Sequence, residues 1–207
     1  MYENLVAAFI TLFVVVDPIA LGPIFIGLTG GMSRDAKRFI ASEASIIAFC
    51  LLAGGAIFGR WLLAKLGISL AAFRIAGGLL LFAIAFEMIF ERRQQRKADT
   101  VATERHHSAD TNIAAFPLAI PLMAGPGAIT AVVLLGTHFD NILGWVLFIA
   151  TIFVIILMSF VVFLCSDILE NVLGARGQVV FGRLFGVLLA ALAVQYVADG
   201  VFAFKGQ

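Results

Sequence analysis

Residues 17–25 read DPIALGPIF and residues 121–128 read PLMAGPGA, and both stretches contain the pattern P-x-x-x-G-P. The two copies lie 103 residues apart and together contain four of the five prolines in the chain. Proline lacks a backbone donor and clashes with the carbonyl one turn before it, and glycine makes departure from helical geometry easier. Because each copy lies within a long apolar run, the pattern predicts two helices that are interrupted partway along their length.

The composition places these helices in lipid rather than in water. The 207 residues are 62% hydrophobic and 13% charged, whereas soluble domains are about 45–50% apolar and about 25% charged. So few polar residues cannot cover a surface that faces water, and the lipid bilayer is therefore the expected partner. The net charge of +1 argues against nucleic acid, whose binding requires clustered positive charge.

Six stretches of the chain are apolar over about 20 residues, the length that a helix needs to cross a bilayer. They are 5–28, 39–58, 70–90, 113–135, 142–166 and 184–204. Their apolar residues run on without alternation, which favours helices over the strands of a barrel. The sequence therefore predicts an all-α integral membrane protein with six transmembrane helices, of which the first and the fourth are broken.

The basic residues divide unevenly between the loops on the two sides of the membrane. Ten of the fourteen Lys and Arg lie in the first, third and fifth loops, and four lie on the other side. Cytoplasmic loops carry an excess of Lys and Arg. These three loops are therefore predicted to be cytoplasmic, and both termini are predicted to lie outside the cytoplasm.

The two copies of the motif divide the chain into similar halves. Residues 1–90 are the first predicted three-helix repeat, residues 91–112 a cytoplasmic linker, and residues 113–207 the second repeat. Because three spans is an odd number, two such repeats in series cross the membrane in opposite senses, as in many transporters. The linker contains His106-His107, but no Cys, Asp or Glu stands at ligand spacing on a defined helix, so neither a metal nor a cofactor is expected.

The two interruptions are expected to meet near the midplane of the membrane and to form a substrate site. A half-helix N-terminus favours an anionic group such as a carboxylate, and Pro23 and Pro126 are each predicted to begin such a half-helix. The candidate substrate-binding residues are Asp17, Pro18, Gly22, Pro23, Pro121, Gly125, Pro126 and Gly127. The alternative is that both motifs are kinks that only shape the bundle.

Three carboxylates within the predicted spans are candidates for proton coupling. Asp17 lies near the middle of the first span, where a carboxylate is costly and usually faces a cavity or a partner; alternatively, it caps the helix that follows. Glu43 lies in the first turns of the second span, where complementing the helix dipole is the favoured explanation. Glu87 lies near the end of the third span, where it lines the path or bridges helices by a hydrogen bond.

In this order, the motifs resemble those of the MarC family of six-span bacterial and archaeal inner-membrane proteins. The first stretch is similar to the family signature D/N-P-I-G-N-x-P-x-F, which is matched here by Asp17, Pro18, Ile19, Pro23 and Phe25. The fourth span is similar to P-L-A-x-P-x-x-A-G-P-G-x-I, which is matched by Pro117, Leu118, Ala119, Pro121, Ala124, Gly125, Pro126, Gly127 and Ile129. The chain departs from the first signature at Ala20-Leu21, where the family often has Gly-Asn.

The resemblance implies a multi-pass protein of the bacterial inner membrane that acts as a secondary transporter, with small neutral amino acids as substrates. A zwitterionic amino acid fits physically, because its carboxylate suits a half-helix N-terminus and its ammonium suits Asp17. A passive channel and a non-transporting membrane protein are the alternatives, and the oligomeric state is left open. An enzyme is not expected and no catalytic residue is assigned, because the spans contain no His, no HExxH motif and no paired carboxylates.

Overall fold

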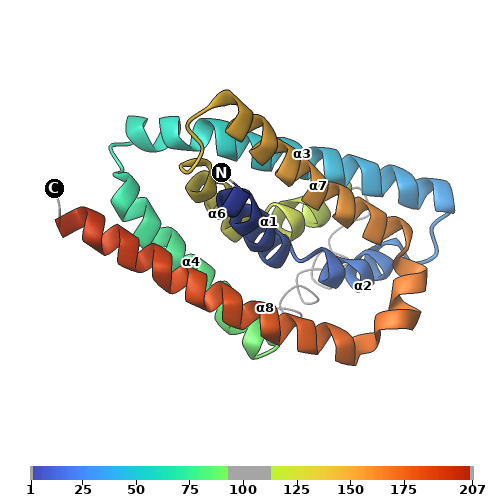
Figure 1. Cartoon of the computed structure of the whole chain (residues 1–207). Coiled ribbons are helices and arrows are strands. Elements are labelled where there is room, and N and C mark those ends of the chain that lie inside the picture. Colours follow the sequence, from blue (N-terminus) through green and yellow to red (C-terminus); the bar gives the residue numbers. More distant parts are fainter. Residues whose placement is uncertain (1, 93–112, 206–207) are drawn as a thin grey trace.

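The computed structural model describes residues 2–92 and 113–205, with the backbone alone at 167–179. The elements, drawn in Figure 1, are α1 (Tyr2–Val16), α2 (Pro18–Thr29), α3 (Arg34–Lys65), α4 (Leu70–Ile89), η1 (Ala114–Met123), α6 (Pro126–Gly136), α7 (Ile142–Leu164) and α8 (Ser166–Lys205). The described residues form helices and no strand, which confirms the all-α prediction. Residues 93–112, with His106-His107 and most of the predicted linker, lie outside the described residues.

The six predicted spans all fall on these helices. In the described part of the chain, five segments are long and apolar enough to cross a membrane. They are α1 and α2 taken together, α3, α4, α7, and Val180–Lys205 of α8. The sixth candidate span is the pair η1 and α6, which bend by 56° at the break between them. α3 extends beyond the predicted 39–58 at both ends, because apolarity marks only the membrane-buried part of a helix and its charged ends reach water.

Side-chain caps explain where three of the long helices begin. The hydroxyls of Ser33 and Ser69 each accept a hydrogen bond from the N–H group three residues later, at 3.3 and 3.1 Å, at the starts of α3 and α4. Asn141 Oδ1 accepts the corresponding bond at the start of α7, at 2.6 Å. These bonds satisfy a donor that the first helical turn leaves open.

Helices from the two predicted repeats lie in pairs (Figure 1). α3 packs along α7 on one side of the molecule, α4 packs along α8 on the other, and α1 and α6 are in contact between them. α2 contacts α7 and α8, whereas α6 contacts α3 and α4. The two broken spans therefore lie at the centre of the bundle, enclosed by the four long helices.

The pair α4 and α8 is packed through small residues spaced seven apart on each helix. The contacts pair residue 71 with 200, residue 78 with 193, and residue 85 with 186. The number rises along α4 as it falls along α8, so the two helices are antiparallel. A methyl group added at Gly78 would lie 2.7 Å from the carbonyl oxygen of Ala193, and one added at Gly200 would lie 2.9 Å from that of Ala71. Small residues let backbones approach closely in a membrane, so this antiparallel seam fixes the separation of the two helices.

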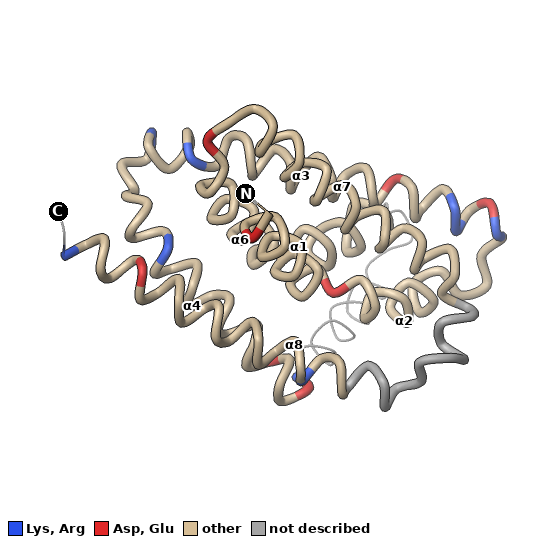
Figure 2. The backbone as a smooth tube through the Cα atoms, in the orientation of Figure 1, with Lys and Arg blue, Asp and Glu red and all other residues tan. Residues whose placement is uncertain are grey.

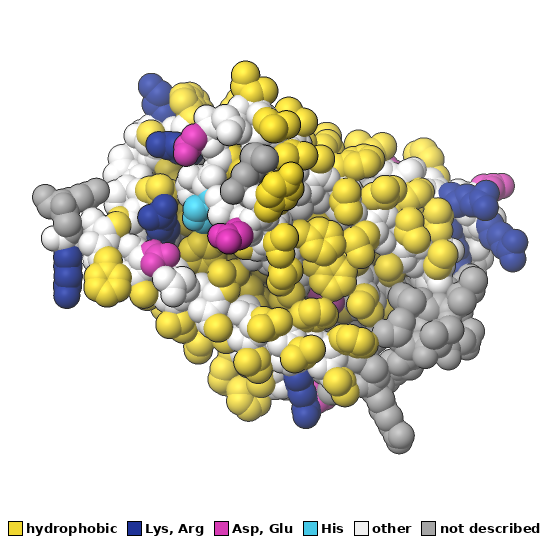
Figure 3. All heavy atoms as spheres, in the orientation of Figure 1, with side chains coloured by type: hydrophobic (Ala, Val, Ile, Leu, Met, Phe, Trp, Pro, Cys, Tyr) yellow, Lys and Arg dark blue, Asp and Glu magenta, His cyan; other side chains and the backbone are white. Residues whose placement is uncertain are grey.

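The surface carries a broad apolar belt between charged ends. Figure 3 shows apolar side chains over most of the middle of one face, and Figure 2 shows basic residues at the ends of α3, α4 and α8. Ile142 is 84% exposed and Phe202 is 72% exposed. Soluble proteins rarely expose contiguous apolar patches of this extent, so the belt is the surface that faces hydrocarbon.

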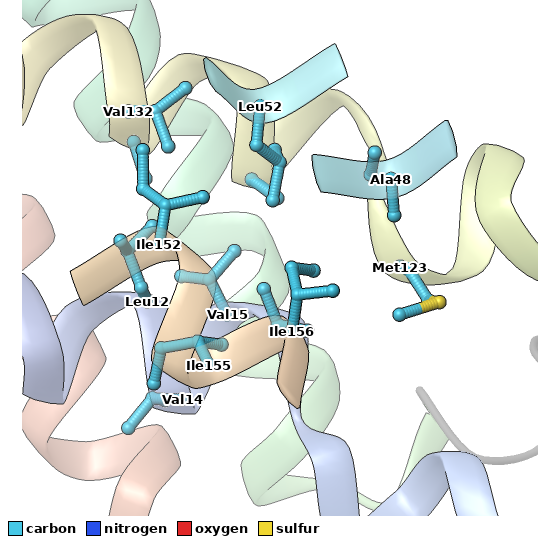
Figure 4. Packing of buried hydrophobic residues seen from close by; sticks show 14 of the residues in the cluster. Leu12, Val14, Val15, Ala48, Leu52, Met123, Val132, Ile152, Ile155 and Ile156 are labelled. Carbon is cyan, nitrogen blue, oxygen red and sulfur yellow. The ribbon is translucent and has the colours of Figure 1, made fainter. Parts of the chain in front are cut away.

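The interior is filled with aliphatic side chains from several elements. Figure 4 shows Leu12 and Val15 of α1 beside Ile152 and Ile155 of α7, with Leu52 of α3 nearby. All five side chains are at most 3% exposed. Close packing of this kind means that any opening near the broken spans requires helices to move.

Candidate functional site

The first broken span is interrupted at Asp17. α1 ends at Val16, α2 begins at Pro18, and Asp17 between them has the left-handed conformation φ 57°, ψ 64°. Proline disfavours the right-handed helical region for the residue before it, and α1 closes with a hydrogen bond from the N–H of Asp17 to the carbonyl of Phe13 at 2.9 Å. A left-handed residue with a Cβ costs about 1–2 kcal/mol, so the surrounding structure holds this break in place.

The helix continues through the second proline of the first motif. Pro23 lies inside α2, and Gly22 before it is helical and buried. The prediction that a half-helix begins at Pro23 is therefore wrong, because the half-helix begins at Pro18. Glycine has no Cβ, which weakens the steric restriction before proline. In addition, the ring of Phe25 stacks on that of Phe163 at 4.7 Å and holds this part of α2 against α7.

The second broken span is more irregular than the first. Within η1, Phe116 (φ −139°, ψ 127°) and Ile120 (φ −123°, ψ 124°) have extended backbones. Each precedes a proline, which explains why each leaves helical geometry. Gly125 is also extended, and Pro126 occupies the first turn of α6. The half-helix predicted to begin at Pro126 is therefore present.

The structure brings the break in the first span into contact with the break in the second span. A methyl group added at Gly127, in the first turn of α6, would lie 3.6 Å from Val15 Cγ1 at the end of α1 and 2.1 Å from Ile84 Cδ1 of α4. α2 also contacts η1. Val15 belongs to the buried apolar cluster, as does Met123 at the end of η1 (Figure 4), so the two interruptions lie among apolar side chains in this conformation.

Asp17 occupies the N-cap position of α2, as the alternative expected, but its side chain makes no capping hydrogen bond there. The half-buried side chain lines a small pocket formed by α1, α2, α4 and α8. The lining residues are Phe13, Val14, Asp17, Ile19, Ala20, Met88, Phe181, Gly182 and Phe185. The cavity volume is about 20 Å³, which is room for roughly one water molecule and too little for an amino acid.

Two aromatic residues of α8, Phe181 and Phe185, belong to this pocket, although the sequence did not indicate them. Their spacing of four residues is the only signal, and it is common in any helix. Arg183 lies between them and forms an ion pair with Glu91, just after α4. Both partners are exposed, so the pair contributes about 0–1 kcal/mol, and it links the end of α4 to the middle of α8 close to the pocket.

The other two candidate carboxylates lie on different elements. Glu87 is half-buried on α4, next to Met88, which lines the Asp17 pocket. Glu43 is half-buried on α3 and is not among the residues that line that pocket. Glu87 is therefore the sequence neighbour of a pocket-lining residue, whereas Glu43 lies on α3, which contributes no residue to the lining of this pocket.

A second polar region lies where the start of α1 meets the loop between α6 and α7. Asn4 donates a hydrogen bond from Nδ2 to the carbonyl oxygen of His138 at 3.3 Å. Burial, and then the nearby Arg74 guanidinium, lower the pKa of His138 below its usual value of 6.5. The imidazole of His138 is therefore neutral at pH 7.

The geometry of the second break predicts a large steric effect at Gly125. A methyl group there would lie 2.5 Å from the carbonyl oxygen of Pro121, a backbone atom that cannot rotate away. We expect Gly125→Ala to destabilise the purified protein by about 1–3 kcal/mol, measured as a lower midpoint of thermal unfolding in detergent. Gly27→Ala in α2 is the control, because no atom lies within 4 Å of its added methyl group. Equal midpoints for the two variants would contradict the tight geometry.

Comparisons with known proteins give consistent results over the whole chain. The family model described as MarC family integral membrane protein matches residues 2–204. A UPF0056 membrane protein of Aquifex aeolicus is 37% identical over 95% of this chain and 91% of its own length. A UPF0056 membrane protein of Methanocaldococcus jannaschii is 33% identical over 96% of both chains. UPF0056 membrane protein YvbG of Bacillus subtilis is 31% identical over 97% of this chain and 95% of its own. No solved structure matches the chain.

Proposed function

Because this chain belongs to the MarC family of multi-pass integral membrane proteins, we propose that it is a secondary transporter that carries a small solute by alternating access. Small neutral amino acids are the proposed substrate class. One observation carries the proposal: two broken spans meet at the centre of the bundle, and a half-buried carboxylate, Asp17, stands at one of the breaks. Helices broken at the interface between two halves are typical of transporter substrate sites.

The start of α6 offers a place for the carboxylate of an amino acid. Its N-cap residue, Gly125, has no side chain to cap the helix, and Pro126 has no N–H group to donate. Gly127 and Ala128 in the first turn are buried. A helix N-terminus carries about half a positive charge and unpaired N–H groups, which favour an anion. The α-ammonium group of the same substrate is then matched by the carboxylate of Asp17.

Transport by this route requires movement of the broken spans. The cavity at Asp17 holds about one water molecule, and Val15 packs beside Gly127 at the contact of the two breaks. We therefore propose that the described conformation is closed, and that α1 with α2 and η1 with α6 shift against the four long helices to admit substrate. The paired long helices, α3 with α7 and α4 with α8, form the frame for this movement.

The orientation in the membrane is part of the same proposal. We propose two inverted repeats in the bacterial inner membrane, with both termini outside the cytoplasm. The contacts support this arrangement, because α2 meets α7 and α8 of the other half as α6 meets α3 and α4. The orientation is supported by the excess of Lys and Arg in the segments that join the predicted spans on one side of the membrane. Two of these residues, Arg176 and Arg183 of the predicted fifth loop, lie within the helix α8 in the structure.

Uptake into proteoliposomes tests the function directly. We expect saturable, stereoselective uptake of radiolabelled alanine, glycine or serine, and faster uptake when unlabelled substrate is trapped inside, because a carrier exchanges substrates through one site. Protein-free liposomes are the control. Flux that does not saturate and shows no counterflow would indicate a channel, and absence of uptake across a broad amino-acid panel would contradict the substrate class.

A further inference from the structure

A groove separate from the broken spans runs between α3 and α7 on the outer side of the bundle. Its volume is about 240 Å³. Six apolar side chains and two serines line it, and no charged residue is among them; the serines are Ser42 and Ser45. We propose that this groove holds an acyl chain of an anionic phospholipid, whose phosphate lies over Arg34 and Arg38 at the start of α3.

The unsatisfied hydroxyl of Ser45 indicates that this groove binds a ligand. Ser45 is 8% exposed, and its Oγ has no hydrogen-bond partner among the residues that the structure describes. The other buried serine and threonine hydroxyls of the described residues each donate to a backbone carbonyl three or four residues earlier; these are Thr11, Thr29, Ser159 and Ser166. Burial of a polar group without a partner is costly. A lipid ester carbonyl in the groove would accept a hydrogen bond from Ser45.

The register of α3 connects this hydroxyl to positive charge. Positions 34, 38, 42, 45 and 49 recur at intervals of three or four residues, so they share one face of the helix. The same face therefore runs from Arg34 and Arg38, through Ser42 and Ser45, to Phe49 in the groove. Both arginines are exposed. By the same periodicity, Glu43 lies on the opposite side of α3.

The depth and charge of this face match a phospholipid rather than a soluble ligand. The rise from Arg38 to Ser45 is about 10 Å, so the charged end and the apolar groove are arranged in the same order as a phosphate and its acyl chains. The first two turns of α3 carry three basic residues and one acidic residue, Asp35. Basic residues beside a groove between transmembrane helices are typical of sites for anionic lipid headgroups.

Native mass spectrometry of the whole protein in detergent tests the proposal. Titration with phosphatidylglycerol and with phosphatidylcholine gives the dissociation constant of the first bound lipid. We expect the wild type to prefer phosphatidylglycerol by about thirtyfold, or about fivefold for each arginine near an anionic headgroup. The double variant Arg34→Gln/Arg38→Gln should lose this preference, and Ser45→Ala should bind both lipids more weakly.

A matched control lies at the other end of the same helix. Arg60→Gln/Lys65→Gln removes two positive charges from α3, far from the groove, and should keep the preference. A phosphatidylglycerol with a photoreactive acyl chain should crosslink to α7 between Phe153 and Phe160 in folded wild-type protein. Equal affinity for the two lipids in the wild type would overturn the proposal. Loss of the preference in the control variant but not in the Arg34→Gln/Arg38→Gln variant would also overturn it. So would crosslinks that are confined to helices other than α3 and α7, or to a second copy of the chain.

Discussion

Replacing Gly78 with Leu is expected to destabilise the folded protein by about 3 kcal/mol, the upper end for overpacked interiors. Even the first carbon of the new side chain would lie 2.7 Å from the carbonyl oxygen of Ala193 and 3.0 Å from the backbone nitrogen of Val197. Backbone atoms of a packed helix cannot rotate away, so α4 and α8 must separate along the whole seam. The measurement is thermal unfolding in detergent, with the monodisperse fraction followed by size-exclusion chromatography.

The control for this variant is Gly54→Leu in α3. No atom lies within 4 Å of a methyl group added at Gly54, and the substitution has the same size and the same gain in helix propensity. We expect its unfolding midpoint to stay close to that of the wild type. A Gly78→Leu variant that unfolds at the wild-type midpoint would show that α4 and α8 are not held by backbone contact.

Replacing Asp17 with Asn is expected to reduce amino-acid uptake at least tenfold and to abolish its dependence on an imposed pH gradient. Asn keeps the size of the side chain and its hydrogen-bonding oxygen but cannot carry the charge. Asp17 is half-buried at a helix break, makes no capping bond and lines a pocket, and ionisable groups at such membrane positions are usually functional. Initial rates in proteoliposomes, measured with and without a pH gradient, provide the readout.

Glu91→Gln is the control for Asp17→Asn. It removes a carboxylate from an exposed ion pair with Arg183, close to the same pocket, and should leave uptake unchanged. Circular dichroism and thermal unfolding should show that both variants are folded, because the side chain of Asp17 makes no capping hydrogen bond to α2. An Asp17→Asn protein with the wild-type rate and pH profile would remove Asp17 from the mechanism and leave the fold untouched.

Most of the fold could be predicted from apolar run length and proline spacing. The predicted third span, 70–90, matches α4 (Leu70–Ile89), and the fifth, 142–166, matches α7 (Ile142–Leu164). Both helices are bounded by sequence signals that act locally, such as the caps at Ser69 and Asn141. The membrane also enforces helices, because it leaves no other partner for the backbone.

The position of the first break could not be predicted from the repeated motif. The same Gly-Pro pair is helical at Gly22-Pro23 and broken at Gly125-Pro126. Local sterics permit both outcomes, because glycine before proline is only weakly restricted. The second copy of the motif is preceded by Pro117, which has no counterpart in the first half. The backbone therefore leaves helical geometry at Phe116, before the chain reaches the second copy. In the first half, the packing of α2 against α7 keeps the helix intact.

The sequence by itself determined that this chain is a helical membrane protein with five or six candidate spans, two of them interrupted, because composition, run length and proline chemistry act through covalent structure and solvent alone. Only the tertiary structure decided which residues stand at the breaks, that Asp17 faces a pocket shared with α8, and that α4 and α8 touch along a glycine seam. These features depend on contacts between residues about a hundred or more positions apart in the chain, whose free energy no local pattern contains.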